Sequence, residues 1–180
     1  MSTAEQNTST TAIPTGTWSL DTVHSSIGFA VQYAGVGTFR GTFDEFDATL
    51  VDGRLEGVAK VATVRVDDPN LAGHLQSPDF FDAEQYPELR FVSKTIERDG
   101  DRVSIEGDLT IRGITHSVES AGSATGPLTD AFGRQRIAFD VETTVNRQDY
   151  GLTWNMELPG GGQALGDDVT ITATLAFVQA

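Results

Sequence analysis

Alternating apolar and polar residues run through most of the chain from Trp18 onward. Successive side chains of a strand point to opposite faces, so a period of two is typical of half-buried antiparallel strands. One face of the first such segment carries Ile27, Phe29, Val31 and Tyr33. Similar alternation recurs at Phe39–Phe43, Phe46–Leu50, Leu55–Val66, Arg90–Ile96, Val103–Arg112, Ile137–Val145 and Val169–Phe177. The pattern predicts an all-β protein with about eight strands.

Short turn signals separate these segments. Asp52-Gly53 and Asp99-Gly100 are residue pairs that hairpin turns favour, and Arg112-Gly113 and Phe132-Gly133 mark two more reversals. Strands joined mostly by short turns form either a sandwich or a closed barrel. The stretch Thr115–Thr129 contains Gly and Pro and gives no clear strand edges.

Two segments lack the alternation. Residues 67–87 contain Pro69, Pro78 and Pro87, and they predict a short helical insertion packed over one end of the sheet. Asp68 is suited to cap a turn that begins at Pro69, because proline fits the first helical position. The glycine-rich stretch Asn146–Asp167 cannot be strand throughout.

The N-terminal residues 1–16 are polar, rich in Ser and Thr, and without periodicity. We therefore expect a disordered tail, followed by one domain at 17–180. The tail has neither the basic nor the apolar region of a secretory signal, which predicts a cytoplasmic location. No apolar run approaches the roughly 20 residues of a membrane-spanning helix, so we expect no stable membrane insertion.

Charge and cysteine content narrow the function classes. The formal net charge is −14, which repels nucleic acid, so we expect no nucleic-acid partner. The sequence has no cysteine, which excludes disulfides, thiolate zinc sites and a thiol nucleophile. Edge pairing of two barrels would give a homodimer, and this assembly is left open.

The expected inward faces mix large and small residues. Phenylalanines at 29, 39, 43, 91 and 139 occur among Gly28, Ala30, Gly41, Ala48, Ala138 and Ala173. This mixture leaves room that a tightly packed core would not leave, and it favours a hollow barrel. A cavity with such walls takes an apolar ligand. The alternative is a filled barrel that acts as a stress-related interaction module.

Three segments carry a family resemblance. The first is Asp21–Phe29 with Gly37–Phe43, the second is His74–Asp82 followed by Tyr86-Pro87 and Phe91, and the third is Gly107–Thr115. In order and spacing they resemble the YceI-like family of polyisoprenoid-binding proteins. The resemblance implies an extended, lipocalin-like antiparallel barrel of eight strands that holds a long isoprenoid or related lipid. We expect a binding protein and not an enzyme, with no metal and no cofactor besides the lipid.

The strand pattern and the family resemblance together indicate which residues lie at the cavity or its entrance. Leu75, Phe80 and Phe81 either plug the barrel end or form the lipid portal. Trp154 packs as an end cap or flanks the entrance with Tyr150. The complete set is His24, Phe29, Val31, Phe39, Phe43, Leu75, Phe80, Phe81, Phe91, Phe139 and Trp154, where His24 is a candidate contact for a ligand head group.

A catalytic alternative rests on two His–Asp combinations. Asp21 and His24 beside Ser25 suggest a nucleophile triad, but adjacent strand residues point to opposite faces, so His24 cannot easily activate Ser25. His74 and Asp79 have a spacing that permits metal binding. A hydrolase or metalloenzyme built on Asp21, His24, His74 and Asp79 is therefore kept as an alternative to lipid binding.

Overall fold

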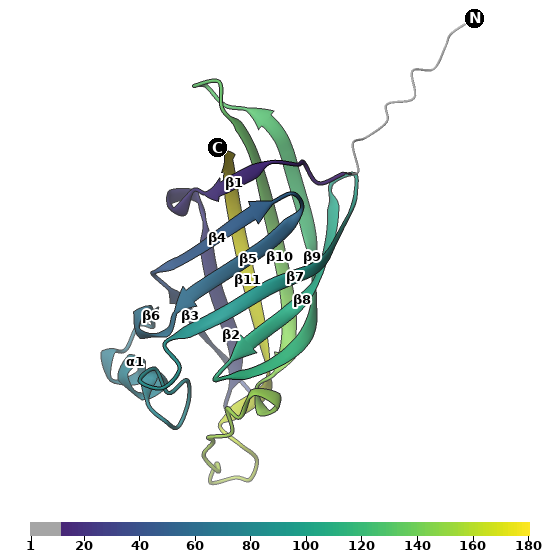
Figure 1. The fold of residues 1–180 in the computed structure, drawn as a ribbon. Helices are drawn as coiled ribbons and strands as arrows, with labels where there is room; N and C mark the ends of the chain where they lie inside the picture. Colours follow the sequence, from purple (N-terminus) through teal and green to yellow (C-terminus); the bar gives the residue numbers. More distant parts are fainter. Residues whose placement is uncertain (1–11) are drawn as a thin grey trace, which may run out of the picture.

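A computed structural model describes residues 12–180 and shows a β-barrel with one short helix (Figure 1). The strands are β1 Thr17–Leu20, β2 Ser26–Tyr33, β3 Gly37–Phe43, β4 Phe46–Val51, β5 Arg54–Lys60, β6 Val64–Arg65, β7 Glu88–Asp99, β8 Arg102–Ile111, β9 Ile114–Thr129, β10 Gln135–Asn146 and β11 Leu165–Gln179. The helical segments are the α-helix α1 Pro69–Gln76 and the 3-10 turns η1 Thr22–His24, η2 Val61–Thr63 and η3 Arg147–Tyr150. The predicted all-β class is confirmed.

Eight of these strands close into a ring. In order they are β1, β4, β5, β7, β8, β9, β10 and β11, and the pairing of β1 with β11 completes the circle. All neighbouring pairs are antiparallel. The closing register sets Trp18 opposite Gln179 and Leu20 opposite Phe177. This confirms the predicted eight-stranded antiparallel barrel.

Strands β2, β3 and β6 extend the sheet beyond the ring. β11 pairs with β1 near its C-terminal end and with β2 along the rest of the same edge, from Thr174 to Leu165. The η1 turn separates β1 from β2. β3 pairs with β2, and the two-residue β6 pairs with β3. These strands lengthen the wall at the end of the barrel where α1 lies (Figure 1).

The local sequence signals account for the tight turns and the helix start. Asp52 and Gly53 have φ of 47° and 81°, the left-handed conformations that a two-residue hairpin turn requires. Asp68 caps α1 by accepting a hydrogen bond from Asn70 N, and Pro69 is the first helical residue. The helical insertion predicted for residues 67–87 is present.

The segment Leu55–Val66 differs from the prediction of one long strand. β5 ends at Lys60, where η2 turns the chain. Thr63 explains the break, because its hydroxyl donates to Lys60 O and accepts from Glu45 N. These bonds offer the backbone a local alternative to the sheet ladder.

The predicted disordered tail falls mostly on residues 1–11, which lie outside the described residues. Residues 12–16 are described, and they contact the barrel. Ile13 packs against the core, and Gly16 exchanges hydrogen bonds with Asp52. Ordered contacts therefore begin before the predicted boundary at residue 17.

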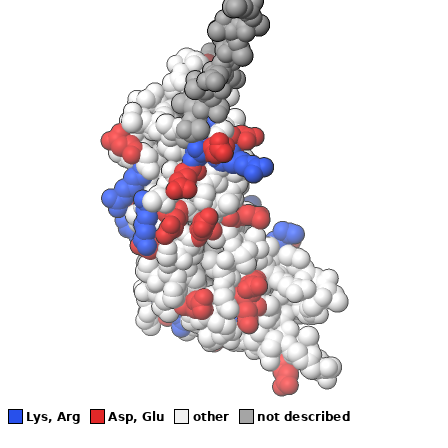
Figure 2. All heavy atoms as spheres, turned by 90° about the vertical axis from the view of Figure 1, so that its right-hand side faces the viewer, with Lys and Arg blue, Asp and Glu red and all other residues white. Residues whose placement is uncertain are grey.

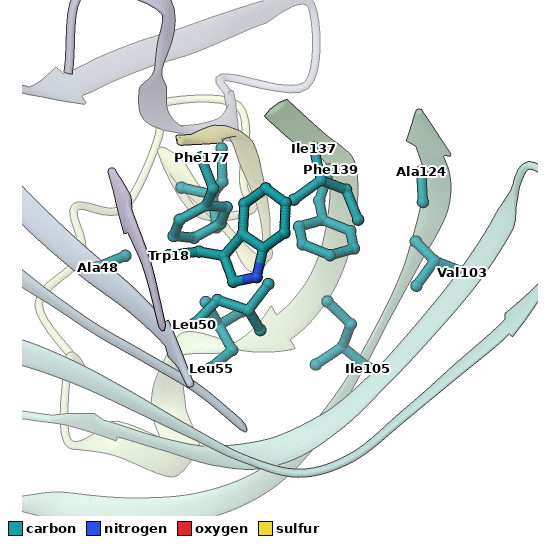
Figure 3. Packing of buried hydrophobic residues seen from close by; sticks show 11 residues of the cluster. Trp18, Ala48, Leu50, Leu55, Val103, Ile105, Ala124, Ile137, Phe139 and Phe177 are labelled. Atoms are coloured by element: carbon teal, nitrogen blue, oxygen red, sulfur yellow. The ribbon is translucent and has the colours of Figure 1, made fainter. Parts of the chain in front are cut away.

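A cluster of buried residues fills the end of the barrel that holds β1 and the C-terminus. We call it the plug; it comprises Trp18, Ala48, Leu50, Leu55, Val103, Ile105, Ala124, Ile137, Phe139, Leu175 and Phe177 (Figure 3). Trp18 is 1% exposed, and the rings of Phe139 and Phe177 pack with centroids 6.1 Å apart. Side chains this closely packed leave no room for a ligand at this end.

The outer surface is strongly charged. Figure 2 shows carboxylates along one face of the barrel, whereas most Lys and Arg side chains on this face lie over its upper half. The excess of acidic groups accounts for the formal net charge of −14. Among residues 12–180, no helix has the length and apolar character needed to cross a bilayer.

Candidate ligand-binding cavity

The half of the barrel beyond the plug encloses a cavity of about 670 Å³. Ala48, Leu55, Ile105 and Leu175 belong to the plug and also line the cavity, so they form its floor. Apolar side chains from several strands form the walls, among them Ile27, Leu109, Val118, Val141, Val169 and Ile171. Walls of this kind favour hydrocarbon and disfavour charged or strongly polar solutes.

Two wall phenylalanines lie against glycines of neighbouring strands. A Cβ atom at Gly41 would collide with the ring of Phe29, and a Cβ atom at Gly107 would lie 2.5 Å from Cζ of Phe91. Glycine at these positions therefore lets each ring approach the adjacent backbone closely. At Gly41 a larger residue would displace the Phe29 ring, and at Gly107 it would also collide with the backbone oxygen of Val92, so both positions require glycine.

The cavity reaches solvent between the β2–β3 hairpin and the loop after η3. Tyr33 and Met156 line the cavity, although 52% and 57% of their surfaces are exposed. The loop is tied to the hairpin by a 2.7 Å hydrogen bond from Ala34 N to Ala164 O. The mouth is therefore bordered by large side chains with apolar surface.

Aromatic side chains from α1 and from the segments around it cover the barrel end beside the mouth. We call His74, Phe80, Phe81 and Trp154 the aromatic cover; all four line the cavity. The Trp154 ring lies 4.8 Å from that of His74 and 5.3 Å from that of Phe80, centroid to centroid. Phe81 packs edge-on against Phe43, with centroids 5.9 Å apart. The cover thus joins α1, the segment after it and the loop after η3.

Arg147 is a buried cation in the cavity wall. The residue is 3% exposed, and its Nε donates to Gly166 O at 2.8 Å. Its Nη1 donates to Leu152 O at 2.6 Å and to Trp154 O at 2.8 Å, which holds the loop after η3. Nη2 has no hydrogen-bond partner among the described residues, and Asp167 Oδ1 lies 3.7 Å away. Burial lowers the pKa of Arg147, and Asp167 opposes that shift.

Tyr150 adds a second buried donor to the same wall. It is 1% exposed, and its hydroxyl has no hydrogen-bond partner within residues 12–180. Burial, with a smaller effect of the Asp149 charge, raises the pKa of Tyr150 to about 12. The hydroxyl therefore keeps its proton at neutral pH and can donate it in a hydrogen bond.

Comparison with known proteins identifies the family. Residues 18–177 match the profile of the YceI-like domain. The chain belongs to the YceI-like family. A UPF0312 protein of Staphylococcus epidermidis is 35% identical over 172 residues, which cover 89% of this chain and 96% of that protein. A UPF0312 protein of Staphylococcus aureus is 33% identical over the same length.

Solved structures share the YceI-like fold. BcnA of Burkholderia cenocepacia superposes with a TM-score of 0.73 at 21% identity, covering 87% of this chain and 98% of that one. A polyisoprenoid-binding domain from Saccharophagus degradans, implicated in plant cell wall breakdown, gives a TM-score of 0.71 at 14% identity. That match covers 91% of this chain and 98% of the other. At these identities the likeness shows the fold alone.

Nine of the eleven predicted ligand-binding residues lie on the cavity wall of this YceI-like barrel. They are Phe29, Val31, Phe39, Phe43, Leu75, Phe80, Phe81, Phe91 and Trp154. They come from β2, β3, β7, α1 and the two irregular segments, which the fold brings to one end. That these residues contact a ligand stays a prediction.

The other two predicted residues lie elsewhere in the YceI-like barrel. Phe139 faces inward but sits in the plug, 0% exposed, whereas Val141 on the same face of β10 lines the cavity. His24 ends the η1 turn, and its side chain is 70% exposed. Neither residue is at the cavity, so their predicted placement is wrong. Ala30 and Ala138 also lie off the cavity wall, because each sits between two inward-facing residues of its strand.

The residues of the catalytic alternative form two separate pairs. His24 Nδ1 lies 2.7 Å from Asp21 Oδ2, but the hydroxyl of Ser25 donates to Asp21 O and not to the imidazole. His74 Nε2 lies 3.1 Å from Asp79 Oδ2 beside α1. Within residues 12–180, no group of three metal-binding side chains gathers. A hydrolase or metalloenzyme built on these four residues requires them to share one site. In the structure they do not.

No pattern in the sequence points to Arg147 as a residue of the cavity wall. An arginine that follows a predicted strand is ordinarily exposed, and nothing in the local pattern distinguishes one that turns inward. The surrounding stretch is irregular, so no periodicity assigns its residues to a face. The buried position follows from tertiary contacts with the loop after η3.

Proposed function

We propose that this protein binds a long apolar lipid of the isoprenoid or polyprenyl type in its cavity, and carries or stores it. The observation that carries the proposal is an apolar cavity of about 670 Å³ inside an otherwise well-packed barrel. Its volume lies within the range of roughly 300–1,000 Å³ that is usual for small-molecule sites. A filled barrel would have no such space.

The shape of the site suits an elongated chain. The plug closes one end, and the mouth opens between the β2–β3 hairpin and the loop after η3. A chain that enters through the mouth would lie along walls such as Ile171 and Val141 and end near the floor at Leu175. The Saccharophagus degradans domain with the same fold is described as polyisoprenoid-binding, which supports the isoprenoid class.

Burial of hydrocarbon alone provides useful affinity. At about 0.3 kcal/mol per heavy atom, a chain of ~20 carbons gains about 6 kcal/mol. This corresponds to a dissociation constant on the order of tens of micromolar. Binding therefore needs no catalytic group and no metal, and longer chains or added polar contacts would tighten it.

Native mass spectrometry tests the proposal. Protein isolated from its own host should show an added mass that disappears after extraction with organic solvent, and the extract should contain a chain-like apolar compound. The extracted protein should take up an isoprenoid hydrocarbon such as phytane. Identical masses before and after extraction, together with no uptake of phytane, would overturn the proposal.

A further inference from the structure

We propose that the cavity contains a polar subsite, formed by Arg147 and Tyr150, which binds an oxygen acceptor at the end of the lipid chain. This inference rests on the proposed lipid-binding function and specifies the head group that the site takes. The acceptor is a carbonyl, carboxylate or phosphate oxygen, and the rest of the ligand is apolar.

Unpartnered buried donors are the first observation. Three buried side-chain atoms of the described residues lack a hydrogen-bond partner: Arg98 Nη1, Arg147 Nη2 and Tyr150 Oη. Arg98 does not line the cavity, whereas Arg147 and Tyr150 both do. An unpaired buried donor costs about 1–3 kcal/mol, so native proteins rarely keep two in one wall without a partner. A ligand oxygen is a partner that the cavity can admit.

The η3 turn places the two donors on one face. Residues three apart in a 3-10 turn eclipse each other, and Arg147 and Tyr150 are three apart. Both are buried, while Gln148 and Asp149 between them are exposed. Both side chains thus border the space in which an acceptor group of the ligand would lie.

The bonds that Arg147 already makes leave Nη2 available. Nε and Nη1 donate to three backbone carbonyls, so the guanidinium is held in one orientation. The Asp167 carboxylate is too far for a hydrogen bond at 3.7 Å, and 56% of its side chain is exposed. The positive charge therefore remains only partly compensated within the wall, which favours an acceptor with full or partial negative charge.

Chain-matched probes test the subsite. Phytane, methyl phytanate and phytanic acid share one isoprenoid chain and differ in the end group: a hydrocarbon, a neutral carbonyl and a carboxylate. Their dissociation constants would be measured by calorimetry on extracted wild-type protein and on Tyr150→Phe. This substitution removes an unpartnered hydroxyl and keeps the ring, so the melting temperature should not fall.

Tyr150→Phe should weaken the binding of methyl phytanate or phytanic acid about fivefold to tenfold, which is the effect of losing one hydrogen bond. The dissociation constant of phytane should not change. Weakening confined to phytanic acid identifies a charged head group, and weakening of both identifies a carbonyl-type acceptor. Tyr86→Phe is the matched control, because Tyr86 does not line the cavity, and it should alter none of the three constants.

Two contrary results have different meanings. If all three probes bind and Tyr150→Phe changes none of them, or lowers the melting temperature by several degrees, the hydroxyl serves the fold and the subsite is refuted. If phytane and both headed probes fail to bind the wild-type protein, the proposed lipid binding itself is refuted.

Discussion

The imidazole of His74 packs edge-on against the indole of Trp154, with ring centroids 4.8 Å apart. The contact joins α1 to the loop after η3, two segments that are 80 residues apart in the chain and meet beside the mouth of the cavity. Arg147, in the cavity wall, holds the same loop by donating a hydrogen bond to Trp154 O. The position of Trp154 therefore depends on both sides of the site.

Removal of the indole should make ligand exchange faster. In Trp154→Ala the aromatic cover loses its contacts with His74 and Phe80, so a bound isoprenoid should dissociate several times faster. Stopped-flow displacement of a fluorescent lipid measures this rate. Phe132→Ala, an exposed aromatic at the far hairpin, is the control. Equal dissociation rates in wild type and Trp154→Ala would show that the cover does not limit exchange.

A bulky residue inside the cavity should compete with the ligand for space. Ala173 lines the cavity on β11, so Ala173→Phe would place a ring in open space and should weaken isoprenoid binding at least about tenfold. The free energy of unfolding should fall by no more than about 1–3 kcal/mol, because Ala173 also packs against the plug and a larger side chain strains that contact. Ala30→Phe on the outer side of β2 serves as the matched control. Normal affinity in a folded Ala173→Phe protein would contradict the assigned position of the ligand.

Plug and cavity should respond differently to truncation. Phe139→Ala should cost roughly 3–5 kcal/mol of unfolding free energy, since its side chain is fully buried in the plug. Phe39→Ala should cost only about 1 kcal/mol, because Phe39 is half-buried at the cavity wall, but it should weaken ligand binding. Urea unfolding of both variants and of the wild type measures these differences in the free energy of unfolding. Equal losses of stability would mean that the two ends are packed alike.

Acid should weaken the ion pairs that Arg136 makes with two aspartates. Arg136 Nη1 lies 2.8 Å from Asp21 Oδ2, and Arg136 Nε lies 2.7 Å from Asp130 Oδ2. Arg136, with a further contribution from His24, lowers the pKa of Asp21 from 3.8 to about 2. Arg136 and nearby backbone amides also lower the pKa of Asp130. Because both pKa values are depressed in the folded state, the stabilisation is complete above about pH 4 and is lost as the pH falls toward 2.

The Arg136→Gln variant tests these ion pairs. Between pH 5 and pH 2 its melting temperature should fall less steeply than that of the wild type, because Asp21 loses its arginine partner and Asp130 keeps only Arg134. Arg65→Gln removes an exposed ion pair with Asp44 and should keep the wild-type pH profile. Parallel curves for wild type and Arg136→Gln would show that Arg136 does not set the pKa of Asp21.

Strands could be predicted wherever one face is buried and apolar. β11 shows this clearly, since Val169, Ile171 and Leu175 alternate with threonines. β9 could not be delimited, because Ser120 and Ala124 are its two buried residues and most of the others are exposed. It is a strand through its pairing with β8 and β10, a tertiary effect that no local pattern reveals.

The cavity could be predicted in outline but not in position. Alternation assigns Phe139 and Val141 to the same inward face, yet it does not say how far along β10 the plug extends. That boundary depends on Trp18, which β1 brings to the barrel end by pairing with β4 and β11. Pairing between strands that are far apart in the sequence cannot be predicted from the local pattern of residues.

Nuclear Overhauser contacts between isotope-labelled methyl groups of the protein and an unlabelled isoprenoid show directly whether the ligand lies inside the barrel. We expect contacts from phytane to the methyl groups of Ile171, Val141 and Leu109 in the cavity wall, and none to Val103 and Ile137 in the plug. Contacts confined to exposed methyl groups such as those of Val23 and Leu128 would contradict this expectation, because the ligand would then lie outside the barrel.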